Sequence, residues 1–437
     1  MNAQGQIVAF DMAYKYLSRW FCITALIIST NALSSNLNLD WDWELSASKT
    51  AHRDTTLIGK TTQSNTESLN ALLDIKANWQ ELTGSFALKG TSLWNREDER
   101  TFDADGIVQE LFWQSSVDFG GLPIDFILGK VRLDWGVGYG YRLLDLFKSY
   151  RRNSIGIQVE EGAGTAMASY FDMNSEWSLI YTDSSWAQQQ GSDLEEQSVQ
   201  QGLGLRHYAL QGDSEWQGIV YYDDVRHGLL SGSFVTVLNQ AWELHVSALY
   251  QRKYLAYQQG TSLTAVGLET KQHGYQSLIG INWASSSGHH VIMEYWFDSR
   301  SWSNNEWQQA FEQGASLSSE IQTQPLALSY AQGLNHANLV QHNLMFHWSL
   351  NSSSWSHLKW SQDWLWLNNF EPSFDVMLSP QDGGIIATQW LRYQIYDTGS
   401  ASFSFELATQ FLGGNGDSVY ANLPDKHIIL LNLKGKF

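Results

Sequence analysis

Hydrophobic and polar residues alternate along most of this chain. Between Leu37 and Ala47 the odd positions are Leu, Leu, Trp, Trp, Leu and Ala, and the even positions are Asn, Asp, Asp, Glu and Ser. A period of two predicts a β-strand with one apolar and one polar face. The clearest further examples occupy residues 69–79, 242–250, 275–283, 291–297 and 403–411. The pattern therefore predicts an all-β protein.

Eighteen segments of this kind can be placed along the sequence. They begin near Leu37, Ser68, Leu82, Ile107, Ile124, Ala163, Glu176, Val199, Ser214, Gly228, Ala241, His273, His289, Leu339, Trp355, Ile385, Ala401 and Lys426. Many are about 10–12 residues long, which matches the roughly 9–11 residues of a tilted transmembrane strand and exceeds the ordinary strand of about 5–6. The pattern is weakest over 124–133, 163–171 and 401–411, so sixteen strands is the alternative.

The predicted connections mostly alternate between long and short. Long ones cover 49–67, 95–106, 134–162, 184–198, 253–272, 299–338, 367–384 and 412–425, and short ones cover 80–81, 120–123, 211–213, 239–240, 284–288, 351–354 and 398–400. The connection over 224–227 is short where the alternation predicts a long loop. Residues 304–313 have the pattern of a short helix within the longest loop. Alternation of this kind predicts a transmembrane antiparallel β-barrel with short periplasmic turns and long external loops. In lipid only a closed ladder of strands satisfies every backbone polar group.

The N-terminus has the layout of a secretory signal peptide. Lys15 and Arg19 precede an apolar run over 20–28, and small residues follow, including Ala32 and Ser34. The run is too short for a membrane-spanning helix, which needs about 20 residues. We expect a signal peptide over 1–34, with Met12 as a potential true start, and a single barrel domain over 35–437. A plug domain is not expected, because the first strand follows the signal directly.

Composition agrees with a large β structure in a membrane. The 437 residues include 21 Trp, 19 Tyr and 19 Phe, which suit aromatic girdles, and only 5 Pro. A secreted β-sandwich or β-helix shares this composition but not the long strands. The net charge of −19 argues against nucleic acid as a partner. Cys22 is the only cysteine and lies in the signal, so disulfides and cysteine-based chemistry are not expected in the mature chain.

The last strand has one strongly apolar face. Between His427 and Phe437 that face consists of Ile429, Leu431, Leu433, Gly435 and Phe437. It resembles the assembly signal of bacterial outer-membrane β-barrels. The resemblance implies recognition of Leu433, Gly435 and Phe437 by the barrel assembly machinery. It also implies that outer-membrane lipid and lipopolysaccharide surround the protein.

Basic residues gather between Gly129 and Asn153 in an otherwise acidic chain. They are Lys130, Arg132, Arg142, Lys148, Arg151 and Arg152. The Gly-Lys pair at 129–130, followed by Trp-Gly at 135–136, resembles a segment of porin-like outer-membrane barrels. We interpret the region as a loop folded into the lumen, with residues 134–153 as the expected constriction. The candidate residues are Lys130, Arg132, Arg142, Arg151 and Arg152, opposite the acidic wall residues Asp40, Asp42 and Glu44. The alternative is that the cations only neutralise these carboxylates.

Gly136, Gly138 and Gly140 would let the same loop turn tightly against the barrel wall. Phosphate binding by these glycines is not expected, because neither P-loop nor Rossmann spacing is present.

Catalytic motifs are sparse. His245 and Ser247 share a strand face and resemble the His-x-Ser pair of the outer-membrane phospholipase family, but they lie on the polar face and no orienting residue can be assigned. Asp223 and Asp224 with His227 are the nearest fragment of an omptin-type protease site. His289 and His290 are adjacent and so face opposite ways along a strand. No enzymatic activity, cofactor or metal site is expected.

These features together predict a porin-like channel in the bacterial outer membrane. It would allow passive or substrate-selective diffusion of small polar solutes through a wet lumen. The alternative is a non-conducting barrel that serves as a structural or docking component, and an outer-membrane hydrolase is the less favoured third reading.

Overall fold

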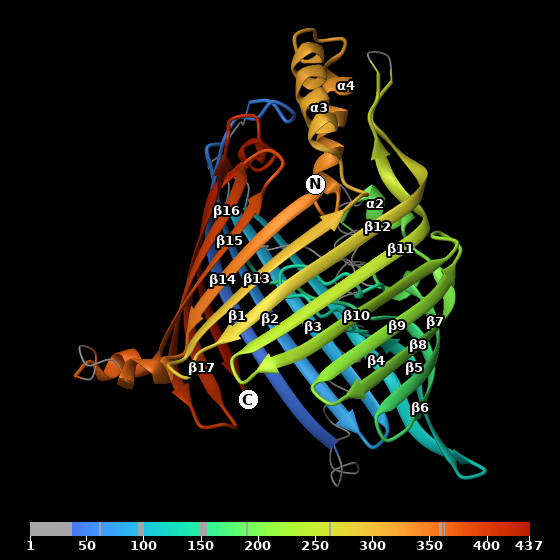
Figure 1. Ribbon diagram of the computed structural model, residues 1–437. Helices are drawn as coiled ribbons and strands as arrows, with labels where there is room; N and C mark the ends of the chain where they lie inside the picture. Colours follow the sequence, from blue (N-terminus) through green and yellow to red (C-terminus); the bar gives the residue numbers. More distant parts are fainter. Residues whose placement is uncertain are drawn as a thin grey trace, which may run out of the picture.

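Eighteen antiparallel strands form one closed barrel in the computed structural model, which describes residues 37–60, 63–94, 100–147, 155–188, 191–261, 264–357, 361 and 363–437 (Figure 1). Each strand pairs with its neighbours in sequence, and β1 pairs with β18 to close the sheet. The strands are β1 (Leu37–His52), β2 (Asn65–Trp79), β3 (Leu82–Trp94), β4 (Arg100–Phe119), β5 (Leu122–Val131), β6 (Ala163–Phe171), β7 (Ser175–Asp183), β8 (Gln201–Gln211), β9 (Ser214–Asp223), β10 (Leu229–Asn239), β11 (Trp242–Gln258), β12 (Gly267–Ala284), β13 (His289–Asp298), β14 (His342–Leu350), β15 (Phe370–Ser379), β16 (Gly384–Asp397), β17 (Ser402–Gly414) and β18 (Asp425–Lys436). The predicted 18-stranded barrel is confirmed. The signal peptide prediction for 1–34 lies outside the described residues.

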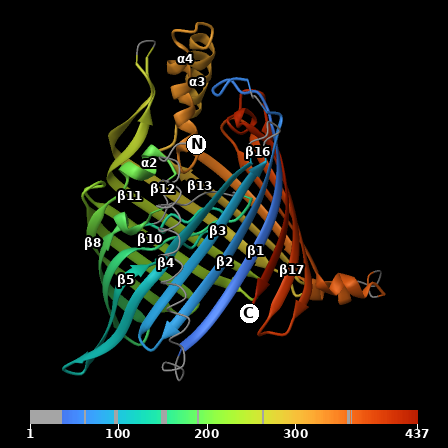
Figure 2. The same ribbon diagram turned by 180° about the vertical axis from the view of Figure 1, so that it is seen from behind.

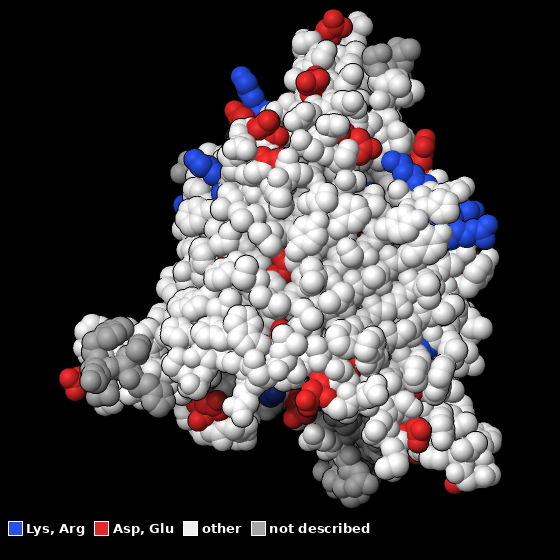
Figure 3. Space-filling model, viewed as in Figure 1, with Lys and Arg blue, Asp and Glu red and all other residues white. Residues whose placement is uncertain are grey.

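The outer face of the barrel wall is apolar, and the inner face carries polar residues beside apolar ones such as Leu278 and Trp296. On β1, Leu39, Trp41 and Leu45 are exposed on the outside, whereas Ser46 is buried towards the lumen. Figure 3 shows a broad band around the middle of the molecule in which few charged side chains appear, with charges gathered above and below it. An outward apolar band on a closed antiparallel sheet is the architecture of outer-membrane barrels.

The closure of the barrel involves the last residue. The backbone groups of Trp41 and Phe437 exchange two hydrogen bonds of 3.0 Å, and their rings stack with centroids 4.7 Å apart. Gly435 pairs with Trp43, and a Cβ on Gly435 would overlap the Trp43 indole. The glycine therefore makes room for an aromatic side chain of the partner strand.

In the part of the chain that the structure describes, helices occur in the connections between strands. They are η2 (Ser184–Trp186), α2 (Asp193–Gln197), α3 (Asn304–Leu317), α4 (Gln324–Ser329), η3 (Tyr330–Asn335), η4 (Ser352–His357), η5 (Leu365–Asn369) and η6 (Tyr420–Asn422). The predicted helix at 304–313 is confirmed by α3, which starts with a capping box between Ser303 and Glu306. Within the described part of the chain, no helix is long and apolar enough to cross a membrane.

One predicted strand and one predicted loop are wrong. The segment from Trp355 is not a strand but belongs to the connection 351–369, which contains η4 and η5. The predicted long loop 367–384 instead holds β15, which joins β16 through a tight turn at 380–383. Trp355 packs with Leu350 and Leu367 in a small local cluster, so its apolar side chain needs no place on the barrel wall. The strand count is unchanged because one strand replaces the other.

Candidate functional site

The connection between β5 and β6 enters the barrel. Residues 132–147, called the infolded loop below, run through the interior behind the front strands (Figures 1 and 2). Leu133, Leu143 and Leu144 of this loop are buried. They belong to one apolar cluster with wall residues, including Leu278 and Trp296. The infolded loop is therefore packed against the lumen wall.

Glycines allow the close approach of this loop to the wall. A Cβ on Gly138 would overlap the carbonyl of Tyr141 and lie 2.8 Å from Leu278. A Cβ on Gly140 would overlap the sulfur of Met345 on β14. Only glycine fits where backbone and wall come this near.

Glu294 of β13 holds the tip of the infolded loop. Its two carboxylate oxygens accept hydrogen bonds from the backbone N–H groups of Tyr139 at 2.6 Å and Gly140 at 2.7 Å. The Nε2 of His245 on β11 lies 2.8 Å from the same carboxylate. Glu294 is almost fully buried, so its charge requires such partners. The tip is thereby fixed to the far wall.

Tyr141 provides a second attachment. Its hydroxyl accepts hydrogen bonds from Gln276 at 2.6 Å and from Arg300 at 3.1 Å. Arg300 in turn pairs with Asp298 at 2.8 Å, and Asn338 donates to the same carboxylate at 2.9 Å. Burial raises the pKa of Tyr141 to about 12, so the phenol stays neutral in ordinary conditions.

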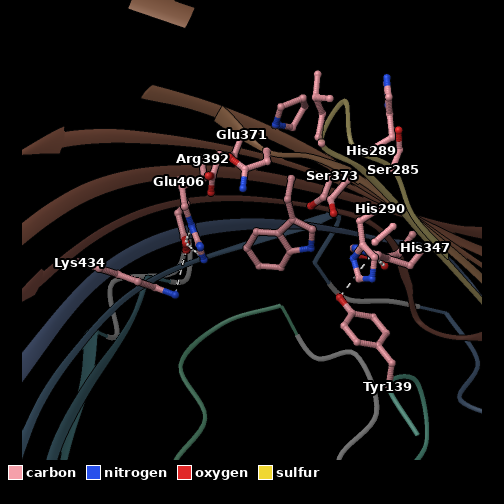
Figure 4. A pocket seen from close by; sticks show the side chains of 18 residues that line it. Tyr139, Ser285, His289, His290, His347, Glu371, Ser373, Arg392, Glu406 and Lys434 are labelled. Atoms are coloured by element: carbon pink, nitrogen blue, oxygen red, sulfur yellow. Dashed lines mark hydrogen bonds and ion pairs between the residues drawn. The ribbon is translucent and has the colours of Figure 1, made fainter. Parts of the chain in front are cut away.

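Two lumen cavities meet the tip of the infolded loop. One has a volume of about 700 Å³ and is lined by Tyr139 together with wall residues that include His290 and His347 (Figure 4). The other, about 560 Å³, is lined by Tyr141 and Arg142. Residues 139–141 therefore lie between the two cavities.

Charges in the first cavity form two groups. Glu406 of β17 lies 2.7 Å from Arg392 and 2.9 Å from Lys434, and Lys434 is also 3.9 Å from Glu44 (Figure 4). In the second group, the Nδ1 of His347 lies 2.7 Å from Asp375. The Tyr139 ring packs on His347, with centroids 4.8 Å apart. The cavity thus offers cations, carboxylates and aromatic faces to a polar solute.

The predicted constriction residues are spread over several places. Arg142 lies on the infolded loop, 3.4 Å from Asp145, and lines the second cavity. Arg132 pairs with Glu110 at 2.9 Å. Arg151 and Arg152 lie outside the described residues.

Lys130 is not brought to the loop tip. It is buried in a pair with Glu161 at 2.8 Å. In the sheet register Lys130 stands opposite Leu111, whose side chain is exposed on the outer face. Because directly paired residues share a face of the sheet, Lys130 belongs to the outer side near the end of β5.

The predicted acidic residues of β1 face the lumen. Glu44 accepts a hydrogen bond of 2.7 Å from Asn432 and lies near Lys434. Asp40 stands opposite Lys76 in the sheet, and Asp42 stands opposite Asp74. Of the three, Glu44 is the one that joins the charged group of the first cavity.

The residues that fix the loop were not singled out from the sequence as its anchors. They are Glu294, Asp298, Arg300, Gln276 and Tyr141. Glu294 and Asp298 occupy alternate positions of β13, as any lumen-facing acid would. The alternating pattern predicts that both side chains face the lumen, but it does not predict which lumen-facing acid contacts the loop.

In the structure His245 lies against a carboxylate and not against a nucleophile. His245 is buried on the lumen side, and its Nε2 lies against Glu294, which also binds the infolded loop. Asp223 of the omptin-like fragment pairs with Arg226 at 2.7 Å. Among the described residues, no group of three His, Cys, Asp or Glu side chains could hold a metal ion.

Comparison with known proteins is informative for the fold alone. No protein-family model and no curated protein matches this sequence. The solved structure of OccAB1 from Acinetobacter baumannii aligns over 93% of this chain and 99% of its own, with a TM-score of 0.51 and 8% identity. The chain has the barrel fold of OccAB1. This agrees with the predicted β-barrel fold.

Two further solved structures align more loosely. OccAB2 of Acinetobacter baumannii has a TM-score of 0.49 at 7% identity, covering 93% of this chain and 98% of its own. The outer membrane protein OpdK from Pseudomonas aeruginosa has a TM-score of 0.47 at 8% identity, covering 92% and 98%. With TM-scores below 0.5, neither adds to the conclusion drawn from OccAB1.

Proposed function

We propose that this protein is a channel of the bacterial outer membrane that lets small polar solutes diffuse across it. One observation carries the proposal: the tip of the infolded loop, residues 139–141, lies between two polar lumen cavities. A loop folded into a wide barrel narrows the path and sets which solutes pass. The weakly charged outer band supports the membrane location.

We further propose that selection occurs at the loop and at the wall facing it. Tyr139 and Arg142 present an aromatic ring and a cation on opposite sides of the tip. The carboxylates of β1, in particular Glu44, supply negative charge on the wall. Separated charges of both signs orient a polar solute and discriminate by charge. Arg151 and Arg152 are included in this proposal only because they follow the infolded loop in the sequence.

The partners proposed for the outside of the barrel follow from its surface. Outer-membrane lipid and lipopolysaccharide would surround the apolar band. The barrel assembly machinery would recognise β18 through the outward face that contains Leu433 and Phe437. No enzymatic activity is proposed, because His245 lies against Glu294, and the carboxylate of Glu294 binds the infolded loop.

Planar-bilayer recording tests the channel. Purified protein should insert and produce discrete conductance steps that scale with salt concentration. Heat-modifiable gel mobility of the same sample should show that the barrel is folded. A folded barrel that fails to conduct at every applied voltage would contradict the proposed channel.

That outcome would support the alternative, a non-conducting barrel with a docking role. One observation favours it: apolar residues of the infolded loop and of the external loops belong to a single buried cluster with the wall. Leu144, Trp302 and Tyr330 of this cluster are almost fully buried. Such packing would close the external end of the lumen if it extended across the whole opening.

A further inference from the structure

The connection between β14 and β15 projects sideways from the barrel. It is drawn in orange at the lower edge of the wall, and it stands away from the strands in two views turned by 180° (Figures 1 and 2). We call its described residues, 351–357, 361 and 363–369, the foot. The foot lies at the same end of the barrel as the turns 80–81, 240–241 and 398–401, which is the periplasmic end by the turn pattern.

The foot is a folded unit with its own small core. Leu350, Trp355 and Leu367 are buried in it, and Trp348 and Phe370 pack against them. The indole N–H of Trp355 donates a hydrogen bond of 2.7 Å to the carbonyl of Phe370. The exposed side chains of the foot are therefore held in place and are not those of a frayed turn.

Three large apolar side chains of the foot are nevertheless exposed. The exposed fractions are 52% for Trp364, 75% for Leu365 and 52% for Trp366. They are consecutive and lie between the core residues Trp355 and Leu367. Over 351–369 the sequence has one Lys and one Asp, and its other polar residues are Ser, Asn, Gln and His. A contiguous apolar group of this size marks a surface that contacts something other than water.

The exposed group is continuous with the outer face of the barrel. The rings of Trp364 and Trp366 lie nearly parallel with centroids 6.4 Å apart, and Trp366 lies 5.9 Å from Phe370. Phe370 is the first residue of β15, and Phe374, four residues further along the strand, stands opposite Trp348 of β14.

Further along the same face, Val376 stands opposite Phe346 and Leu378 opposite Leu344. Phe346 and Leu378 are exposed on the outer surface. The aromatic row thus prolongs the lipid-facing strip of β14 and β15 beyond the wall itself.

We infer that the foot lies in the interface of the periplasmic lipid leaflet, with Trp364, Leu365 and Trp366 directed into the lipid. Indole rings favour this depth because their apolar body enters the acyl region while the N–H remains near the headgroups. The lateral projection places the foot beside the barrel, where the bilayer is, and not beneath the lumen. The inference requires a membrane-spanning barrel but does not depend on whether the barrel conducts.

Site-specific labelling tests the position of the foot. Cys22 is the only cysteine of the sequence, so Cys22→Ser gives a background without thiols. In this background Leu365→Cys is labelled with the environment-sensitive dye NBD and reconstituted at low protein density into phosphatidylethanolamine and phosphatidylglycerol vesicles. Fluorescence is then measured with iodide on both sides, or with lipids that carry a nitroxide near the headgroup or at the chain end.

Matched controls come from polar or distant positions. Ser353→Cys samples an exposed polar residue of the same foot, and Ile321→Cys samples an exposed apolar residue of the connection between α3 and α4. Trp364→Cys repeats the test at a second apolar position of the foot. Heat-modifiable mobility of each labelled protein shows that it is folded.

The expected result is blue-shifted emission at 365 and 364, with stronger quenching by the shallow nitroxide than by the deep one and little quenching by iodide. The dye at 321 should show the opposite result, with strong quenching by iodide and little quenching by the nitroxide lipids. Strong iodide quenching without lipid quenching at 365 would overturn the inference, because the foot would then stand in water. Protection from both quenchers would also overturn it and would indicate contact with a second copy of the chain.

Discussion

The carboxylate of Glu294 accepts a hydrogen bond of 2.6 Å from the backbone N–H of Tyr139, which lies 155 residues earlier in the chain. This contact joins β13 to the tip of the infolded loop across the interior of the barrel. The adjacent N–H of Gly140 binds the second oxygen of the same carboxylate. Glu294 is therefore one of the wall residues that fix the position of the loop in the lumen.

Glu294→Gln should loosen the loop tip. The amide nitrogen would replace one of the two accepting oxygens and face a backbone N–H donor, so at least one charged hydrogen bond, which contributes about 1.5–3 kcal/mol, would be lost. We expect a larger and noisier single-channel conductance in planar bilayers. Glu371→Gln is the matched control, because Glu371 also lines the first cavity and its carboxylate accepts a hydrogen bond from the backbone N–H of Ser352. Equal conductance changes in both variants would contradict a positioning role for Glu294.

The triple variant Arg142→Ser, Arg151→Ser and Arg152→Ser tests the proposed constriction. Removing three cations from the narrow part of a pore favours cation passage. The reversal potential in a salt gradient should shift towards cation selectivity. Arg53→Ser, in the connection between β1 and β2, provides a control for loss of positive charge elsewhere. An unchanged reversal potential in the triple variant would remove these arginines from the constriction.

Tyr141→Phe should destabilise the infolded loop more than Tyr139→Phe. Tyr141 loses a hydroxyl that accepts from Gln276 and Arg300 in a buried site, at a cost of about 1–3 kcal/mol. The hydroxyl of Tyr139 has a longer contact of 3.4 Å with His347. Thermal unfolding in detergent, followed by heat-modifiable mobility, should rank the two variants in this order. The opposite ranking would show that Tyr141 is not the stronger anchor.

Gly435→Ala should impair barrel closure. The added Cβ would collide with the Trp43 indole, and overpacking of this kind costs about 1–3 kcal/mol. The folded fraction after refolding into detergent should fall. Gly413→Ala is the matched control on the neighbouring strand, because a Cβ there meets nothing within 4 Å. If both variants fold as the original does, the Trp43 contact has no role in closure.

Acid should loosen the external loop that contains His336. Burial lowers the pKa of His336 from 6.5 to about 4, so the folded loop holds the imidazole neutral. Between these pH values the opened loop binds a proton that the folded loop does not, so loop stability falls as the pH falls from about 6.5 to 4. The full effect is on the order of 3 kcal/mol.

Protection factors from hydrogen exchange over 301–341 at pH 7 and pH 4.5, each referred to the intrinsic exchange rate at that pH, measure this loosening. His336→Gln should remove the pH dependence, since glutamine does not titrate. A variant whose exchange depends on pH as the original does would show that another group is responsible.

The alternation of residues was enough to predict the strands, because each wall residue faces either lipid or the lumen. Leu39 and Asp40 on β1 show this directly. The same rule was misleading at Trp355, whose side chain is buried in a local cluster with Leu367 and so has no need of the wall. It was also insufficient at Lys130, whose side of the sheet follows from its pairing with Leu111.

The sequence by itself determined a closed antiparallel barrel with an apolar outer band, and it singled out a basic glycine-containing segment between two strands. These properties follow from local pattern, because side chains alternate between the two faces of a strand and this alternation decides which of them contact lipid. Only the tertiary structure decided where that loop goes. Its path depends on Glu294, Gln276 and Arg300 meeting residues more than a hundred positions away, and such contacts arise from the closure of the sheet and not from any local preference.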